Sequence, residues 1–414
     1  MPRLAFFTDV YRPEAKIARF LSVLVFSGIA FGLYRGIQDN YLAEIIHISP
    51  FERGIVEFFR EIPGFMVIFI LALLYRYSDS RIFKIGVAIM SGGIAGLLLS
   101  SSSPFLMSKF LVVFFMVLFS AGEHITMPVK TTISMDLAKR EKAGISLGIT
   151  SSINQLGQIT GFLLVTAIFI ILARMGVKQT DILGYRLVFG LSCALMIITT
   201  LVVLALKETT LKSRKRRFYF AKKFSKYYIL EVFYGGRKQI FLTFAPYVLI
   251  LHYGANPSIM SLLFAACAGF GILFGPLTGR IIDKLGYKVV LVGDTLILIV
   301  VCLLYGFAHR LFPPKIAFIV VCSNFVLDSI ISMASMANNV YVQRIASSQE
   351  EITATLSTGI SVNHFISIFI ALLGGWIWKI TGIEVLFSIS ALMGLINSLF
   401  ALTIKKSEEQ AISA

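Results

Sequence analysis

The chain has 414 residues, of which 57% are hydrophobic and 14% charged, and its mean hydropathy is +0.83. An ordinary soluble domain is about a quarter charged. The hydrophobic residues form long runs that are apolar on all sides, as a bilayer requires of a spanning helix. These values exclude a water-soluble fold and predict a polytopic helical membrane protein.

Basic residues outnumber acidic ones, and the net charge is +16. They flank the apolar runs without any nucleic-acid recognition module, so we expect no nucleic acid as a partner. The cysteines lie inside apolar runs without the spacing of metal ligands, which predicts packing roles and neither a metal nor another cofactor. They are Cys193, Cys267, Cys302 and Cys322.

Apolar runs near the ~20 residues needed to cross a bilayer recur twelve times along the chain. Several runs are longer than this, so their helices must tilt, bend or extend into water. We expect spans at residues 18–46, 51–77, 83–101, 106–136, 143–173, 184–206, 226–252, 257–281, 287–308, 315–344, 352–379 and 383–404.

The 38 Lys and Arg are distributed unevenly around these spans. Most lie in the termini and the even-numbered loops, which by the positive-inside rule predicts cytoplasmic termini in an integral plasma-membrane protein. Residues 207–227 form a basic linker between an amino-terminal half, 1–206, and a carboxy-terminal half, 228–414. Phe218, Phe220 and Phe224 interleave with its basic residues, so we expect the linker to contact membrane lipids at the inner surface.

The two halves resemble each other in sequence. Tyr34 in the first span aligns with Tyr234 in the seventh at an offset of 200, and Asn154 in the fifth aligns with Asn363 in the eleventh at an offset of 209. An offset that drifts smoothly in this way indicates a few small insertions in one half. Internal repeats of this kind are how many transporters build a site between two halves. The repeat predicts an all-α membrane fold of two pseudo-symmetric six-helix bundles.

The loop between the eighth and ninth spans carries the most specific motif. Residues Gly279 to Lys288 have the sequence GRIIDKLGYK, which resembles the loop signature of the major facilitator superfamily of twelve-span secondary transporters. The resemblance implies a gate made of Gly279, Asp283, Gly286 and Lys288. In such a gate the aspartate contacts the amino terminus of a helix or a basic residue. Gly279 permits the close approach of a neighbouring helix, and Gly286 allows the chain to turn.

Other patterns of this family are less complete. The first-half copy of the loop keeps Asp79, which we add to the gate, but has Tyr75 and Ile82 where glycines are expected. Gly157 and Gly161 in the fifth span lack the proline and last glycine of the antiporter pattern, so efflux by proton exchange loses support. Small residues spaced four apart also simply allow tight helix packing.

Ionisable residues deep in spans are costly and usually face the bundle interior, so they are the best guide to a site. The basic ones lie mainly on the first, fourth and seventh spans, which line the central cavity in the family. Amide side chains on spans five and eleven could bind the same solute or bridge neighbouring helices. The expected solute-binding residues are Arg35, Gln38, Asp39, Lys130, Asn154, Arg237, Lys238 and Asn363.

Two acids occupy corresponding positions in the repeat, Glu123 in the fourth span and Asp328 in the tenth. Acids in apolar surroundings can take up a proton near neutral pH, so we expect these two to couple transport to protons. His124 beside Glu123 can act likewise, or can fill a packing role. Glu57, Arg60 and Glu61 share a face of the second span, and we interpret them as structural partners of Arg35 or Asp39; Asp294 is interpreted as structural too.

The charged residues expected to line the cavity have a small net positive charge when the acids are ionised, and a larger one once the acids are protonated. We therefore expect a monomeric carrier of a small organic anion that works by alternating access, with protons as the coupling ion. Export of lipophilic compounds, with the charges as structural pairs, stays open, as does a non-transporting sensor or a channel on a carrier fold. No phosphate loop and no His-Glu-x-x-His motif is present, so we do not expect an enzyme.

Overall fold

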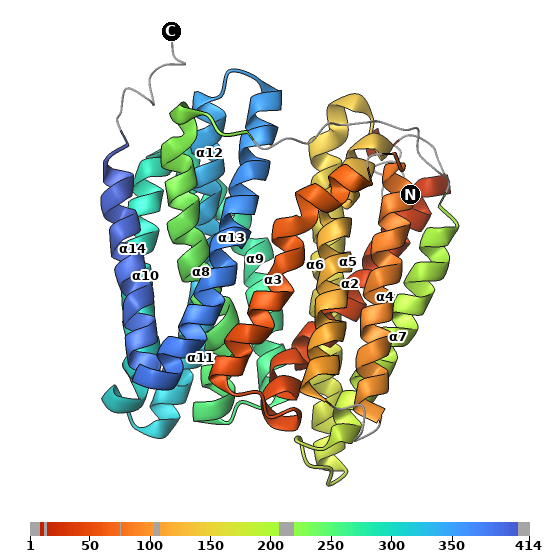
Figure 1. The fold of residues 1–414 in the computed structure, drawn as a ribbon, viewed down its shortest axis with the longest axis vertical. Coiled ribbons are helices and arrows are strands. Elements are labelled where there is room, and N and C mark those ends of the chain that lie inside the picture. Colours follow the sequence, from red (N-terminus) through yellow and green to blue (C-terminus); the bar gives the residue numbers. More distant parts are fainter. Residues whose placement is uncertain (1–8, 12–14, 75, 103–107, 207–218, 405–414) are drawn as a thin grey trace. The chain divides into compact units, whose positions relative to one another are not determined.

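The computed structural model describes residues 9–11, 15–74, 76–102, 108–206 and 219–404. Helices make up nearly all of these residues, and no β-strand forms within the described ranges (Figure 1). The helices of the first half are α2 (Ala15–Asn40), α3 (Pro50–Leu73), α4 (Asp79–Ser102), α5 (Lys109–Leu137), α6 (Ala143–Arg174) and α7 (Ile182–Leu204).

The second half continues with seven helices after the linker. They are α8 (Ser225–Tyr253), α9 (Pro257–Leu285), α10 (Tyr287–Leu311), α11 (Pro314–Ile331), α12 (Met336–Ile345), α13 (Gln349–Thr381) and α14 (Ile383–Leu402). A short 3₁₀ turn, Ser332–Ser335, joins α11 to α12. A π-helical turn, Tyr41–Ile45, extends α2.

Ten segments in the described part are long and apolar enough to cross a membrane, with α11 and α12 forming one of them. Two more helices, α3 and α8, reach spanning length but carry several charges, among them Glu57 and Arg60 in α3 and Glu231 and Arg237 in α8. Each of the twelve spans expected from the sequence thus coincides with a helical segment, and the expected all-α membrane architecture is confirmed. The chain is an integral membrane protein.

The residues at the helix ends explain where several helices begin or turn. Side chains of Ser108, Asp181 and Ser348 accept backbone hydrogen bonds at the starts of α5, α7 and α13, the arrangement of an N-cap. Gly286 has φ of 83°, a backbone conformation that side-chain-bearing residues rarely adopt, and it links α9 to α10.

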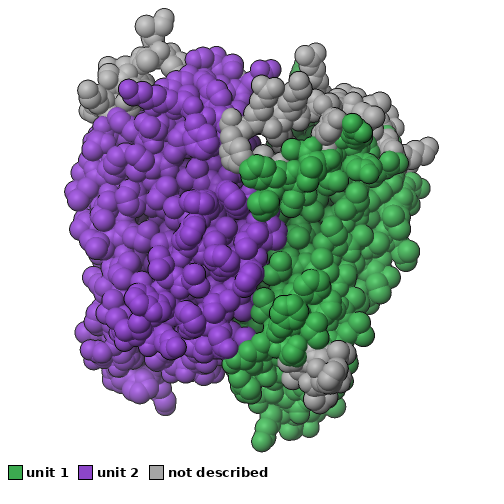
Figure 2. Space-filling model, in the orientation of Figure 1, with its two compact units in different colours: residues 1–47, 66–215, 256–268 green, residues 48–65, 216–255, 269–414 purple. Residues whose placement is uncertain are grey.

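Two compact units make up the chain (Figure 2). Unit 1 consists of Met1–His47, Met66–Lys215 and Asn256–Ala268. Unit 2 consists of Ile48–Phe65, Arg216–Ala255 and Gly269–Ala414. Helices α3 and α9 each contribute to both units, whereas the sequence predicts a division at the linker 207–227, most of which lies outside the described residues.

Within unit 1, α2 packs against α6 and α7, and α4 packs against α5 and α7. Glycines bring α2 and α6 together: an added Cβ at Gly32 would lie 2.2 Å from the carbonyl oxygen of Gln158, and one at Gly161 would lie 2.3 Å from that of Ile29. Backbones this close leave room only for hydrogen at those positions. Gly161 therefore serves helix packing, as the sequence allowed.

Within unit 2, α8 packs against α13 and α14, and α10 packs against α11 and α14. One end of the unit is closed by buried aromatic rings, of which Tyr287 and Tyr341 lie with their centroids 5.3 Å apart. Helix α8 carries two buried charged residues of unit 2, Glu231 and Arg237.

Candidate functional site

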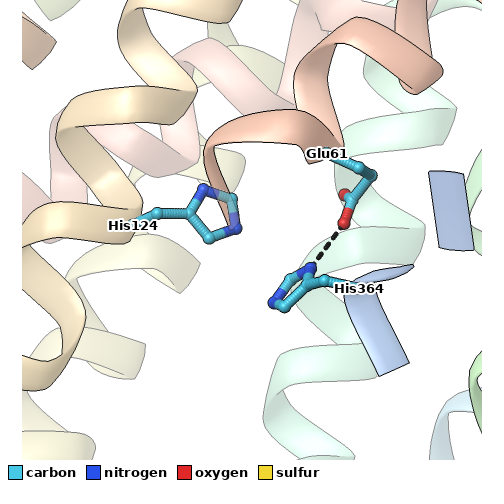
Figure 3. Close-up of side chains that lie close together, drawn as sticks. All are labelled: Glu61, His124 and His364. Carbon is cyan, nitrogen blue, oxygen red and sulfur yellow. Dashed lines mark hydrogen bonds and ion pairs between the residues drawn. The ribbon is translucent and has the colours of Figure 1, made fainter. Parts of the chain in front are cut away.

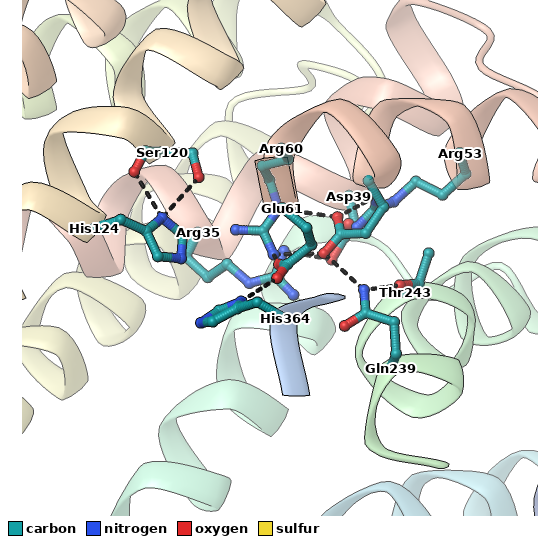
Figure 4. A network of polar contacts seen from close by, with 11 residues as sticks. Arg35, Asp39, Arg53, Arg60, Glu61, Ser120, His124, Gln239, Thr243 and His364 are labelled. Atoms are coloured by element: carbon teal, nitrogen blue, oxygen red, sulfur yellow. Dashed lines mark hydrogen bonds and ion pairs between the residues drawn. The ribbon is translucent and has the colours of Figure 1, made fainter. Parts of the chain in front are cut away.

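Four charged side chains on α3 form what we call the α3 cluster: Arg53, Glu57, Arg60 and Glu61 (Figure 4). Their spacing of three and four residues places them on one helix face. Nη1 of Arg53 donates to Oε2 of Glu57 over 2.7 Å, and Nη2 of Arg60 donates to Oε1 over 2.5 Å. Arg53 and Glu57 are each 1% exposed, so the pairing compensates charges that water does not reach.

Residues of α8 and α13 complete the α3 cluster within unit 2. Nε2 of Gln239 donates to Oε1 of Glu57 over 3.1 Å and to the hydroxyl of Thr243 over 2.9 Å. Nδ1 of His364 donates to Oε2 of Glu61 over 2.7 Å (Figure 3). Because each contact is at normal hydrogen-bond distance, the cluster joins this part of α3 firmly to α8 and α13.

A second group, the Arg237 cluster, is built differently. Nη2 of Arg237 on α8 lies 3.6 Å from Oδ2 of Asp294 on α10, and Nη1 lies 3.6 Å from Oδ1 of Asp328 on α11. Arg237 is 2% exposed, and its guanidinium carbon lies 5.3 Å from the ring centroid of Tyr234. At 3.6 Å these are ion pairs without hydrogen-bond geometry, so the guanidinium is held more loosely than those of the α3 cluster.

The Arg237 cluster changes how two expected residues are understood. Arg237 and Asp328 were assigned by sequence to solute binding and proton coupling, and the structure brings them together. Asp294, interpreted from sequence as structural, is the third member. Its only sequence signal is an acid within an otherwise apolar run of α10, which gives no indication of its partner.

Glu231 lies on α8 about two helical turns before Arg237 and is held by two amides. Nδ2 of Asn338 donates to its Oε1 over 3.0 Å, and Nδ2 of Asn363 donates to its Oε2 over 3.3 Å. Glu231 is 9% exposed. Lys238 on the same helix attracts this carboxylate. Asn363, expected to bind solute, thus bridges α13 to α8 in this structure.

In unit 1 the expected group on α2 forms an ion pair beside an aromatic ring. Nη1 of Arg35 lies 3.1 Å from Oδ2 of Asp39, and its guanidinium carbon lies 5.2 Å from the ring centroid of Phe264. The ring of Phe264 stacks on that of Phe162, with centroids 5.5 Å apart. Gln38 is 3% exposed, so this face of α2 is buried and polar.

The expected residues of α5 also belong to unit 1. Nδ1 of His124 lies 2.8 Å from the backbone oxygen of Ser120 and 3.2 Å from its hydroxyl (Figure 4). Glu123 and Lys130, two turns apart, attract each other. On α6, the backbone oxygen of Asn154 lies 2.7 Å from where a Cβ of Gly28 would be, so Asn154 stands at the close α2–α6 contact.

The gate motif occupies the end of α9 and the start of α10. Gly279 and Asp283 lie in the last two turns of α9, and Asp283 is exposed. Lys288 donates from Nζ to the backbone oxygens of Leu402 and Ile404, over 2.8 and 2.7 Å, and so caps the carboxyl end of α14. In the first-half copy, Asp79 is the first residue of α4, where a carboxylate is favoured by the helix dipole, and Tyr75 lies outside the described residues.

Sequence reasoning missed several members of these groups. They are Arg53, Thr243, Gln239 and Asn338. Arg53 could have been found, because it lies four residues before Glu57 on the same helix face. The neutral residues carried no such signal, because their role depends on which helices become neighbours.

Comparison with known proteins gives the family. The model of the Major Facilitator Superfamily matches the chain twice, over residues 20–235 and 227–413. No curated protein matches the sequence.

Solved structures resemble the fold at low sequence identity. The nucleoside transporter NupG is 14% identical with a TM-score of 0.72, covering 95% of this chain and 100% of its own. A D-xylose-proton symporter is 13% identical with a TM-score of 0.70, covering 94% and 98%. A POT family transporter in complex with 5-aminolevulinic acid is 11% identical with a TM-score of 0.73, covering 94% and 96%. The double match over nearly the whole length places the chain in the major facilitator superfamily.

Proposed function

We propose that this protein is a proton-coupled secondary transporter of a small organic anion, working by alternating access. The observation that carries the proposal is the Arg237 cluster, in which one buried guanidinium lies 3.6 Å from each of two carboxylates. The three side chains come from three helices of unit 2, and none of the contacts has hydrogen-bond geometry. Such a group can exchange partners more readily than the tightly bonded α3 cluster.

The charges of the cluster link anion binding to proton binding. With both acids ionised, the cluster has one negative charge in excess, and with one proton it is neutral. A second proton leaves the guanidinium uncompensated, which is costly in a buried place. A solute carboxylate restores neutrality, so the proton and the anion each favour binding of the other by the same free energy.

The similar structures are consistent with a secondary transporter, but they do not indicate which solute this protein carries. One is described as a nucleoside transporter and one as a D-xylose-proton symporter, so the fold accommodates both neutral solutes and proton coupling. A third is described in complex with 5-aminolevulinic acid. The choice of an anion therefore rests on Arg237 and its partners.

Reconstitution into liposomes tests the proposal. We would measure uptake of labelled mono- and dicarboxylates under an imposed pH gradient, with a nucleoside, a sugar and a lipophilic dye as comparison solutes. An organic anion is expected to accumulate with the gradient. R237Q should lower its uptake by about tenfold or more, because a charged hydrogen-bond partner contributes roughly 1.5–3 kcal/mol.

The acids provide the sharper test. A single remaining carboxylate can still take up a proton, and the solute anion then compensates the charge of Arg237. D294N and D328N, each tested alone, should therefore retain a response to the gradient. The double variant leaves Arg237 permanently without a carboxylate in its cluster, and its anion uptake should no longer depend on the pH gradient. K315Q and E350Q remove exposed charges and serve as controls.

Two results would count against the proposal. Wild-type uptake that does not depend on the gradient would show that transport is not coupled to protons. A double variant that responds to the gradient as the wild type does would show that Asp294 and Asp328 do not provide the coupling. Transport of the dye alone, unaffected by R237Q, would instead support export of lipophilic compounds with the buried charges as structural pairs.

A further inference from the structure

A groove of about 420 Å³ lies on unit 2, and none of its lining residues belongs to the α3 cluster or the Arg237 cluster. It runs between the end of α10 and the start of α14, with one residue from the end of α13. Its lining residues are Phe307, Arg310, Thr381, Glu384, Val385, Ser388, Ile389 and Leu392.

The lining changes character along the groove. Arg310, Thr381 and Glu384 lie at helix ends, where the chain leaves the apolar part of the membrane. From Glu384 to Leu392 the α14 side of the groove extends two turns, or about 12 Å at 1.5 Å per residue, into the span. Phe307 lies one turn deeper than Arg310. A polar end at the membrane surface and an apolar floor below it match an amphiphile better than a water-soluble solute.

The two charges at the polar end are held differently. Glu384 has a side chain 15% exposed and pairs with both Arg310 and His309, whose Nε2 lies 3.3 Å from its Oε1. The side chain of Arg310 is 65% exposed. Arg310 can therefore turn toward a phosphate while Glu384 keeps a partner in place.

We propose that this groove binds a phospholipid with a primary ammonium headgroup, of the phosphatidylethanolamine type. Arg310 receives the phosphate, Glu384 receives the ammonium, and one acyl chain follows Phe307, Val385 and Leu392. A primary ammonium donates hydrogen bonds to the carboxylate, whereas the quaternary ammonium of a choline lipid has no N–H to donate. The groove thus distinguishes these two lipids by Glu384.

Lipid binding by the delipidated, detergent-purified protein tests the site, with affinities measured by native mass spectrometry. Phosphatidylethanolamine should bind about tenfold more tightly than phosphatidylcholine or phosphatidylglycerol. O-phosphoethanolamine, which has the headgroup but no chains, should bind at least about a hundredfold more weakly than the lipid. That arm separates a lipid site from a site for a soluble phosphate compound.

Variants assign the preference to named side chains. E384Q should bring the ethanolamine and choline lipids to within about twofold of each other, and R310Q should weaken all three lipids about tenfold. S388F keeps both charges but fills the groove, so it should also lose the lipid, and K315Q should behave as the wild type. Equal affinity for the three lipids in the wild type, an ethanolamine preference that survives E384Q, or binding unchanged in R310Q and S388F would overturn the proposal.

Discussion

Glu57 accepts hydrogen bonds from three different side chains although it is 1% exposed. Its donors are Arg53 and Arg60 on its own helix and Gln239 on α8. A buried carboxylate without such partners would be strongly disfavoured, and with them it fixes both arginines in place. Glu57 therefore acts mainly as a structural centre of the α3 cluster, in contrast to the acids around Arg237.

Replacing Glu57 by glutamine should destabilise the protein markedly. The substitution keeps the shape of the side chain but leaves two arginines without their shared carboxylate, and breaking a buried pair in this way costs roughly 3–5 kcal/mol. The expected result is a clear fall in the melting midpoint of the detergent-solubilised protein. E350Q is the matched control, since Glu350 is exposed; equal midpoints for the two variants would show that the α3 cluster contributes little to stability.

At the level of residues, the sequence predicted which charges are buried better than it predicted their partners. Arg237 and Asp328 were both singled out, because a charge within an apolar run is conspicuous. Their meeting, and the presence of Asp294 beside them, depends on the packing of α8, α10 and α11. Single-sequence patterns report burial along one helix and carry little information on which helices become neighbours.

The positions of the membrane-spanning helices could be predicted from the hydropathy of the sequence. All twelve expected spans coincide with helical segments, because lipid leaves a spanning chain no alternative but to satisfy its backbone within the helix. Two details escaped prediction, the π-helical turn after α2 and the 3₁₀ turn between α11 and α12. Each is a single turn of four or five residues that differs from an α-helix only in its hydrogen-bond pattern, and a hydropathy profile does not report that pattern.

The close contact of α2 with α6 predicts that a larger side chain at Gly32 destabilises the protein. An alanine normally stabilises a helix by up to about 1 kcal/mol relative to glycine. At Gly32 the new Cβ would lie 2.2 Å from a backbone oxygen of α6, which cannot move as a side chain can. G32A should therefore lower the melting midpoint and the yield of monodisperse protein in size-exclusion chromatography.

Gly148, which lies on α6, provides the control for this test. An added Cβ there would meet no atom within 4 Å, and the position is exposed. G148A should thus be neutral or slightly stabilising. If G32A and G148A behaved alike, the glycine contact would not be what determines how closely α2 approaches α6.

For the whole molecule, we predict the orientation in the membrane from the distribution of charge, because the fold does not determine it. The same helices could cross in either direction, and the uneven distribution of Lys and Arg among the loops distinguishes the two. With cytoplasmic termini, the loop between α6 and α7 faces outward and the loop between α12 and α13 faces inward. Thr180 and Ser347 lie exposed in these loops.

Cysteine labelling in intact cells measures this orientation directly. In a background whose four native cysteines are replaced by alanine, T180C should react with a membrane-impermeant maleimide, and S347C should react only after permeabilisation. The pair controls for expression and reactivity, because permeabilised cells should label both variants and intact cells should label T180C alone. The reverse labelling pattern would place both termini outside. Helix α14 begins on the side of the membrane opposite to its carboxyl end, so the reverse pattern would also place the groove at the start of α14 in the cytoplasmic leaflet.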